Sequence, residues 1–301
     1  MTTTAAKSRV PKVTREKLER LRRILRRMGR ALVAFSGGVD STFLLKVAAE
    51  ELEGDVLAVI ARSETYPERE VRAAVALARK IGIEHLVIKT GEIDNPAFAA
   101  NSPRRCYHCK RELFSRLKEL AAERAFPYVL DGSNHDDRTD YRPGALAARE
   151  LGIRSPLREA KMTKAEIRRL SKEIGLPTWD KPSLACLASR IPYHTPIERK
   201  TLLQVAKAEE VLRRLGLTQV RVRHHGDIAR LEVDPEDFRR IMKPGARQRV
   251  IAGLKKAGYT YIALDLEGYR TGSLNEPLRK TAGLRRPRPE EPAGRIPRLV
   301  P

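Results

Sequence analysis

The clearest chemistry in the chain belongs to six consecutive residues, Ser36-Gly37-Gly38-Val39-Asp40-Ser41. An apolar run precedes them and apolar residues at helical spacing follow, so they form the turn from a buried strand into a helix. Adjacent glycines let backbone N–H groups approach an anion, and the helix N-terminus directs free N–H groups toward it. Ser36 and Ser41 add hydroxyl donors, and Asp40 is suited to hold a metal ion or orient a donor. The turn therefore predicts a phosphate-binding loop without the lysine of the Walker P-loop.

The three cysteines form the second group of reactive residues. Cys106 and Cys109 make a CxxC motif at the predicted start of a helix, where a thiolate has a lowered pKa, and Cys186 lies far away in sequence. A chain of 301 residues with three cysteines does not suggest a disulfide framework.

Four interpretations of these cysteines remain open. A zinc site needs four ligands, but His108 sits inside the only CxxC motif. A redox disulfide leaves Cys186 without a role, and a sacrificial or persulfide-bearing Cys186 leaves the CxxC without one. Three thiolates on a four-iron, four-sulfur cluster leave one iron open for a sulfide or a substrate. The cluster is favoured because it uses all three cysteines.

Alternating elements position the phosphate loop. The pattern predicts a basic N-terminal helix, strands at 31–35, 55–61, 84–88 and 127–131, and helices at 41–52, 67–81, 109–124 and 163–174. Such alternation indicates an α/β fold with a parallel sheet, covered by helices on both faces. Ligands of these sheets bind at the carboxyl ends of the strands, where the loop lies. We assign this domain to residues 13–182.

A smaller α+β domain follows, which we assign together with a crossing loop to residues 183–275. The proline-rich stretch 175–196 has little periodicity and is expected to cross the site. Beyond it the pattern predicts a helix at 197–215, strands at 218–223, 228–233 and 259–265, and a helix at 235–256 broken near Pro244, with an antiparallel sheet. Residues 1–12 and 276–301 are predicted to be a disordered basic arm and a disordered Pro/Arg-rich tail.

Two arginines alternate with valines in the first strand of this domain. A period of two places Arg221 and Arg223 on one face of the strand. Paired arginines suit a phosphate, although a solvated strand face gives the same pattern. Arg190 in the crossing loop is a third candidate.

The charge of +22 suggests an anionic partner, but Arg and Lys are mixed with Glu along helical segments, which also fits solvated helix faces. We expect no membrane partner, because no apolar run approaches the roughly 20 residues that span a bilayer. The N-terminus has no signal-peptide pattern, so we expect a cytoplasmic protein.

Several segments together resemble the PP-loop family of ATP pyrophosphatases and, more closely, its LarE branch, the ATP-dependent sulfur transferases of nickel-pincer nucleotide biosynthesis. The resemblance runs from about Arg20 to Leu274. Beside the SGGVDS loop, it rests on Asn101 to Lys110, Asp131 to Asn134, Asp136-Asp137, Asp140 to Gly144 and Ser183 to Pro192. It implies a Rossmann-like, adenine nucleotide alpha hydrolase-like domain and a homo-oligomer.

The resemblance also implies a reaction. Members adenylate a carboxylate of pyridinium-3,5-biscarboxylic acid mononucleotide with ATP and Mg²⁺, and a sulfur nucleophile then displaces AMP to leave a thiocarboxylate. In one branch a cysteine at the position of Cys186 gives up its own sulfur. In another branch the CxxC cysteines join it on a four-iron, four-sulfur cluster that carries sulfide. This chain, with all three cysteines, resembles the second branch.

Roles for individual residues follow from the same resemblance. It implies that Cys186 and Asp40 are catalytic and that Cys106, Cys109 and Cys186 are the cluster ligands. The residues implied to bind the nucleotide are Ser36, Gly37, Gly38, Asp40, Ser41, Ser63 and Gly132. Arg190, Arg221 and Arg223 would bind the substrate phosphate, and Glu209 and Glu232 would lie near a second metal or phosphate site.

Three other functions remain as alternatives. A PP-loop tRNA thiolase also combines the loop with three cysteines, but aromatic residues for base stacking make up only 5% of the chain. An ammonia-using PP-loop synthetase leaves the cysteines unexplained, and a nucleotide sensor without turnover fits poorly with an intact loop.

Overall fold

Four parallel strands form the larger sheet, in the order β3-β2-β1-β4. The computed structural model describes residues 10–138, 143–182, 185–270 and 272–276. The strands are β1 Ala31–Ala34, β2 Val56–Arg62, β3 His85–Lys89 and β4 Tyr128–Leu130. They are apolar and largely buried in the two central strands, as expected for a parallel sheet covered on both faces. The predicted α/β fold class is confirmed.

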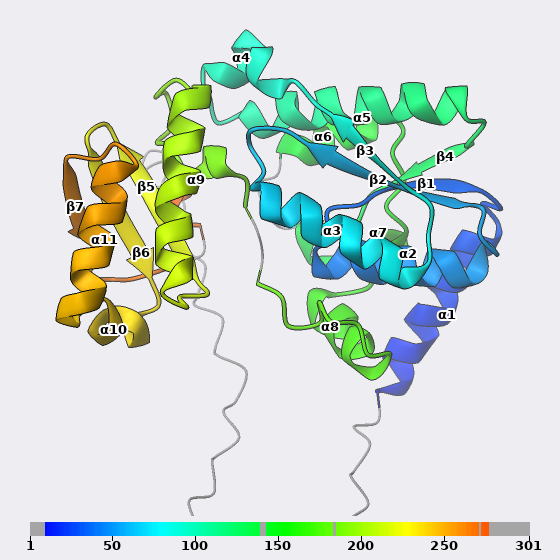
Figure 1. Ribbon diagram of the computed structural model, residues 1–301. Coiled ribbons are helices and arrows are strands. Elements are labelled where there is room, and N and C mark those ends of the chain that lie inside the picture. Colours follow the sequence, from blue (N-terminus) through cyan, green and yellow to red (C-terminus); the bar gives the residue numbers. More distant parts are fainter. Residues whose placement is uncertain (1–9, 139–142, 183–184, 271, 277–301) are drawn as a thin grey trace, which may run out of the picture.

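Helices pack on both faces of this sheet (Figure 1). One hydrophobic core joins the sheet to α1 Lys12–Arg26, α2 Val39–Glu51, α3 Glu68–Ile81, α7 Pro156–Glu159 and α8 Lys164–Glu173. A second core joins the opposite face to α5 Arg105–Glu123 and α6 Pro143–Glu150. The loop after β1 therefore lies at the edge of a rigid, double-sided scaffold.

Some helix boundaries differ from the sequence prediction. Helix α5 begins at Arg105 rather than at 109, so Cys106 lies in its first turn and Cys109 in its second. Helix α1 begins at Lys12 and Val10 is buried in the core, so the last residues of the predicted disordered arm are ordered. The short helices α4 (Pro96–Ala99), α6 and α7 were not predicted, because four to eight residues carry too little periodicity. Residues 1–9 and 277–301 lie outside the described residues.

The smaller domain has its own sheet and its own hydrophobic core. Its elements are α9 Arg199–Arg214, β5 Val220–His225, β6 Ile228–Val233, α10 Phe238–Met242, α11 Pro244–Lys256 and β7 Tyr261–Leu264. The helix break expected near Pro244 is confirmed, since the preceding Lys243 adopts an extended ψ of 135°. The antiparallel prediction is wrong for one pair: β5 and β6 are antiparallel, but β7 lies parallel to β6. The crossover through α10 and α11 returns the chain to the starting end of β6 and so allows parallel pairing.

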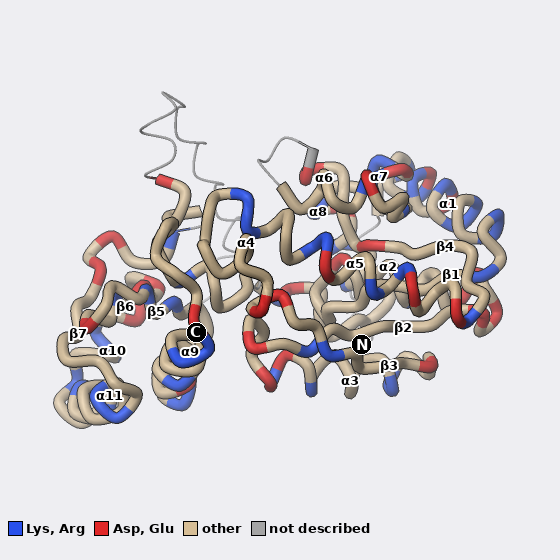
Figure 2. Tube along the Cα trace, turned by 90° about the horizontal axis from the view of Figure 1, so that it is seen from above, with Lys and Arg blue, Asp and Glu red and all other residues tan. Residues whose placement is uncertain are grey.

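The charges spread over both domains. Figure 2 shows Lys and Arg interspersed with Asp and Glu on most helices. Many of these charges pair, as Arg22 and Arg26 do with Glu51. This distribution agrees with solvated helix faces. Within the described part of the chain, no helix combines the length and apolar character needed to cross a membrane.

Candidate active site

The phosphate loop occupies the turn between β1 and α2, as predicted. Gly38 is the N-cap residue of α2, and no side chain among the described residues caps the helix there. The N–H groups of the first turn consequently remain available to an anion, in line with the positive end of the helix dipole.

Two glycines allow close packing of backbone at this loop. Gly37 has a left-handed φ of +65°, and a Cβ on it would lie 3.0 Å from the Cβ of Ala74 in α3. Gly132 follows β4, and a Cβ there would lie 3.0 Å from the backbone N of Ser41. The loops after β1 and β4 thus touch through backbone, which places Gly132 beside the phosphate loop.

Polar side chains complete the loop. The hydroxyls of Ser36 and Ser41 are 3.0 Å apart. Asp40 accepts a hydrogen bond from Nδ2 of Asn134 at 3.5 Å and pairs with Nζ of Lys164 at 2.5 Å. The carboxylate therefore already lies between a donor and a cation.

Sequence reasoning missed two lysines at this loop. Lys164 begins α8, directly after the capping box of Thr163 and Glu166. Lys181 Nζ donates to the carbonyl oxygen of Gly37 at 3.0 Å and pairs with Glu70 at 3.1 Å. Both lie more than a hundred residues from the loop in sequence, so only the tertiary structure brings them to it.

Ser63 lies beyond the end of β2, at the same sheet edge. Its hydroxyl donates to Oε1 of Glu92 at 2.6 Å, and the hydroxyl of Thr65 donates to the same oxygen at 2.5 Å. Glu92 is only 2% exposed. The Ser63 side chain is therefore held by a buried carboxylate, and its carbonyl oxygen accepts from the N–H of Tyr66 at 3.2 Å.

The three cysteines approach one another from two segments. Cys109 and Cys186 pack against the same apolar cluster around Leu187 and Ile191, while Cys106 is exposed. Loss of solvent raises the pKa of Cys109, and the Glu92 carboxylate raises it further. Although Cys106 is exposed as a whole residue, protein atoms surround its sulfur, and this desolvation, followed by the charge of Cys186, raises its pKa. The lowered pKa expected from the helix N-terminus is wrong here, because desolvation outweighs the dipole.

Tyr66 is a further neighbour that the sequence did not reveal. The charge that Cys109 would carry as a thiolate, followed by burial, raises the pKa of the Tyr66 hydroxyl. No three His, Cys, Asp or Glu side chains among the described residues converge on a single point that would hold one metal ion. A four-iron cluster binds each thiolate through a different iron, so its ligand sulfur atoms lie farther apart than those of a single zinc ion.

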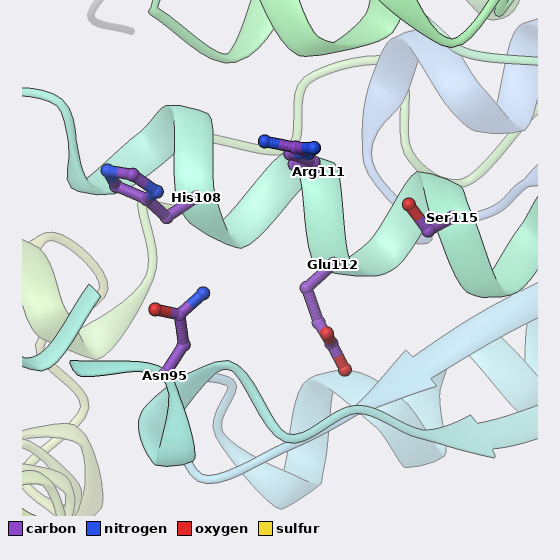
Figure 3. Close-up of a pocket in the computed structure, with 5 residues that line it drawn as sticks. All are labelled: Asn95, His108, Arg111, Glu112 and Ser115. Carbon is purple, nitrogen blue, oxygen red and sulfur yellow. The ribbon is translucent and has the colours of Figure 1, made fainter. Parts of the chain in front are cut away.

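His108 points into a polar pocket on the flank of α5. Figure 3 shows it opposite Asn95, and the remaining lining residues are Arg111, Glu112 and Ser115. None of these residues belongs to the phosphate loop, and no cysteine lines the pocket. His108 is thereby turned toward α4 and away from a role beside its two cysteine neighbours.

A buried arginine cluster lies where the crossing loop meets the smaller domain. Arg190, only 1% exposed, forms a two-pronged ion pair with Glu209 of α9, with N–O distances of 2.7 and 3.1 Å. Arg213 pairs with the same carboxylate. Although burial alone would raise the pKa of Glu209, Arg190 and Arg213 lower it below its ordinary value.

Arg221 and Arg223 of β5 belong to the same cluster. They are 5% and 6% exposed, so the solvated strand face is ruled out. Arg223 pairs with Glu232 at 2.8 Å and donates to Ser273 at 2.7 Å, yet its Nε is buried without a partner among the described residues. Arg221 stacks over the ring of Tyr269 at 5.1 Å. An unsatisfied buried donor beside several guanidiniums fits a site for a phosphate oxygen.

Comparison with known proteins identifies relatives that cover from about half to most of the chain. The sequence model of the NAD synthase family matches residues 15–121. An uncharacterized protein from Synechocystis sp. is 45% identical over 88% of this chain and 98% of its own length. The pyridinium-3,5-bisthiocarboxylic acid mononucleotide synthase of Lactiplantibacillus plantarum is 40% identical over 85% of this chain and 92% of its own length. A tRNA-specific 2-thiouridylase from Xanthobacter autotrophicus is 30% identical over 51% of this chain and 49% of its own length.

The sheet, its SGGVDS turn and the match to NAD synthase define the class first: this is an enzyme of the PP-loop ATP pyrophosphatase superfamily, which uses ATP and Mg²⁺. Within that class the chain belongs to the LarE family, since the Lactiplantibacillus synthase aligns with it over nearly the full length of both proteins. The predicted family is thereby confirmed.

Proposed function

We propose that this chain is an ATP-dependent sulfur transferase that converts a carboxylate of pyridinium-3,5-biscarboxylic acid mononucleotide into a thiocarboxylate. One observation carries the proposal: the segment that holds Cys186 is hydrogen-bonded both to the loop after β2 and to the arginine cluster. The N–H of Leu187 donates to the carbonyl of Thr65, just beyond β2, at 2.8 Å. Nη1 of Arg190 donates to the carbonyl of Cys186 at 3.0 Å. The cysteine therefore lies between the nucleotide domain and the arginine cluster.

The phosphate loop serves the adenylation step. A substrate carboxylate oxygen attacks the α-phosphorus of ATP, the bond to the bridging oxygen breaks, and pyrophosphate leaves. The free N–H groups of α2 and the hydroxyls of Ser36 and Ser41 bind the charge of the departing group. Asp40 would hold Mg²⁺, which neutralises charge on the pyrophosphate. Lys164 and Lys181 supply the positive charge that the loop itself lacks.

The arginine cluster holds the phosphate of the substrate mononucleotide. Arg190, Arg221 and Arg223 offer planar donors from a buried position. Glu209 and Glu232, expected near a second metal or phosphate site, act here by keeping Arg190 and Arg223 oriented. Binding at the cluster would place the carboxylates of the substrate toward the crossing loop and Cys186.

Sulfur transfer follows at the cysteines. A sulfur nucleophile attacks the acyl carbon of the adenylate, the bond from that carbon to the AMP oxygen breaks, and AMP leaves with the electron pair. Cys106, Cys109 and Cys186 would hold a four-iron, four-sulfur cluster, which supplies an iron position where sulfide binds. Binding of the cluster would require these thiols to lose their protons.

Two measurements on wild type and on Cys186→Ala test this function. With ATP, the biscarboxylate mononucleotide and sodium sulfide, after anaerobic cluster reconstitution, both proteins should release pyrophosphate, but only wild type should form thiocarboxylate, detected by mass spectrometry. After anaerobic reconstitution, wild type should bind about four irons per chain and each single Cys→Ala variant should lose them. Thiocarboxylate made at the wild-type rate by Cys186→Ala would contradict the proposed role of this residue.

A tRNA thiolase is the second candidate, because the 2-thiouridylase aligns with half of this chain. It predicts that tRNA, and not the mononucleotide, triggers pyrophosphate release. The two substrates are compared at moderate salt, since phosphate-driven tRNA binding weakens steeply as salt rises.

A further inference from the structure

Asn101 joins the two segments that carry the cysteines. It lies five residues before Cys106 and is fully buried at 0% exposure. Its Nδ2 donates to the carbonyl of Pro192 at 2.7 Å and to that of Thr195 at 2.8 Å. Both carbonyls belong to the crossing loop, a few residues beyond Cys186. One amide group thus uses both of its donors to hold the two segments together.

The acceptor side of the same amide faces the CxxC helix. Oδ1 of Asn101 accepts from Nη1 of Arg105 at 2.5 Å, and Arg105 is the first residue of α5. The Arg105 guanidinium also stacks over the ring of Tyr193 at 4.6 Å. A continuous set of contacts therefore runs from the start of α5, where Arg105 directly precedes Cys106, through Asn101 to the crossing loop.

The backbone around Asn101 adds to this junction. The N–H of His194 donates to the carbonyl of Asn101 at 3.0 Å, and the N–H of Ile197 donates to that of Ala99 at 2.8 Å. Asn101 itself has a left-handed φ of +53°, a region that asparagine tolerates better than most residues. Aspartate would keep the shape but lose both donors, and glycine would keep the backbone but lose every side-chain contact.

We propose that Asn101 is a positioning residue that sets the separation between Cys186 and the CxxC cysteines. This inference extends the proposed function. It rests on one part of it, namely that the three cysteines act together. A residue that merely stabilised the fold would not change the distance between these thiols in the folded protein.

A short bifunctional thiol reagent, dibromobimane, reports that distance. The full-length chain is treated with chelator and reductant, cross-linked and digested. Mass spectrometry then gives the ratio of products joining Cys186 to either CxxC cysteine, relative to the product joining Cys106 to Cys109. The second product lies within one helix and serves as an internal reference. We expect this ratio to fall at least fivefold in Asn101→Asp and in Asn101→Gly.

Asn95→Asp is the matched control, because Asn95 caps α4 with an acceptor oxygen that aspartate retains. Its ratio should equal that of wild type. Wild-type protein without any Cys186 cross-link, or an unchanged ratio in a folded Asn101 variant, would overturn the inference. Thermal melts identify the folded variants, and Asn101→Gly remains as a test where Asn101→Asp does not fold. Wild type that binds no iron yet shows the expected ratios would reject the cluster and leave the positioning role intact.

Discussion

The phosphate loop and the arginine cluster both attract anions, but they do so by opposite means. The loop uses backbone N–H groups at the start of α2, which water can satisfy when no anion is bound. The cluster uses guanidiniums that are nearly inaccessible to water, and each of Arg190 and Arg223 is matched by a fully buried glutamate. The first site needs no countercharge from the protein, whereas the buried arginines of the second are stable only together with their glutamates.

This difference predicts which property of the protein a mutation at each site will change. Removing a partner from a buried ion pair leaves an uncompensated charge, which destabilises the folded state strongly. The function of the loop depends on its backbone shape, because a side-chain atom added at Gly37 would collide with the backbone of α3. Damage to the cluster should appear as lost stability, and damage to the loop as lost ATP chemistry.

The largest effect is expected for Glu209→Gln. This change leaves Arg190 and Arg213 without their shared countercharge, and the free energy of unfolding should fall by about 3 kcal/mol. Urea denaturation measures it. Glu210→Gln is the matched control: Glu210 is the next residue, pairs with Arg214 and Arg69, and has a side chain that is 45% exposed, so its loss should stay below about 1 kcal/mol. Equal losses would remove the energetic distinction between the two sites.

Gly37→Ala should damage ATP chemistry in addition to the loss of stability that a side chain at a left-handed φ brings. The new Cβ would lie 3.1 Å from the Cα of Ala74, which cannot move without α3, so the loop must change shape. We expect ATP-dependent pyrophosphate release to fall about 100-fold, as when one positioned donor is lost. Gly29→Ala has a similar φ of +68° but faces open space among the described residues, so it should lose stability alone. Normal turnover in Gly37→Ala would show that the loop tolerates a Cβ.

Lys164→Met tests whether the loop borrows its positive charge. The lysine pairs with Asp40 and, by our proposal, serves the β- and γ-phosphates. Calorimetric titration should show ATP affinity reduced about tenfold, or about 1.4 kcal/mol, with AMP affinity unchanged. Lys172→Met, on an exposed face of the same helix, should bind both nucleotides as wild type does. An equal loss for AMP would assign Lys164 a purely structural role.

The smallest effect is on pH dependence. The arginines lower the folded-state pKa of Glu209 below its ordinary value. Such a group stabilises the fold above its unfolded pKa, near 4.3, and loses that contribution as pH falls through the folded value. Denaturation series from pH 6 to about 3 should therefore show a steeper loss of stability for wild type than for Glu209→Gln. Parallel curves would mean that Glu209 titrates alike in both states.

The loop was predictable because its chemistry lies in adjacent residues. A strand, two glycines and a helix N-terminus specify one geometry, and the structure has it at Gly37 and Gly38. The four parallel strands followed from apolar runs of the right length. The start of α5 was misplaced because the sequence before Arg105 has no capping signal. The N-cap residue is Arg104, whose side chain makes no capping hydrogen bond.

The arginine cluster was only half predictable. Alternation placed Arg221 and Arg223 on one face, but nothing in β5 indicates burial, which depends on Glu209 and Glu232 arriving from other elements. The lysines at the loop and the contacts of Asn101 are likewise long-range, and no local pattern reports them. The direction of β7 depends on how its preceding helices cross the sheet, and that is a property of the assembled domain.

Helix α1 has a consequence for anyone who shortens this chain. Leu21 and Leu25 are completely buried, and Lys17 reaches Glu166, whose capping box begins the helix that carries Lys164. A truncation that starts at Gly29 would therefore expose the hydrophobic core that α1 covers and remove the contact between Lys17 and Glu166 of α8. Affinity tags belong before Val10, because a fragment that starts at Gly29 would bind ATP more weakly although every residue proposed to bind ATP is still present.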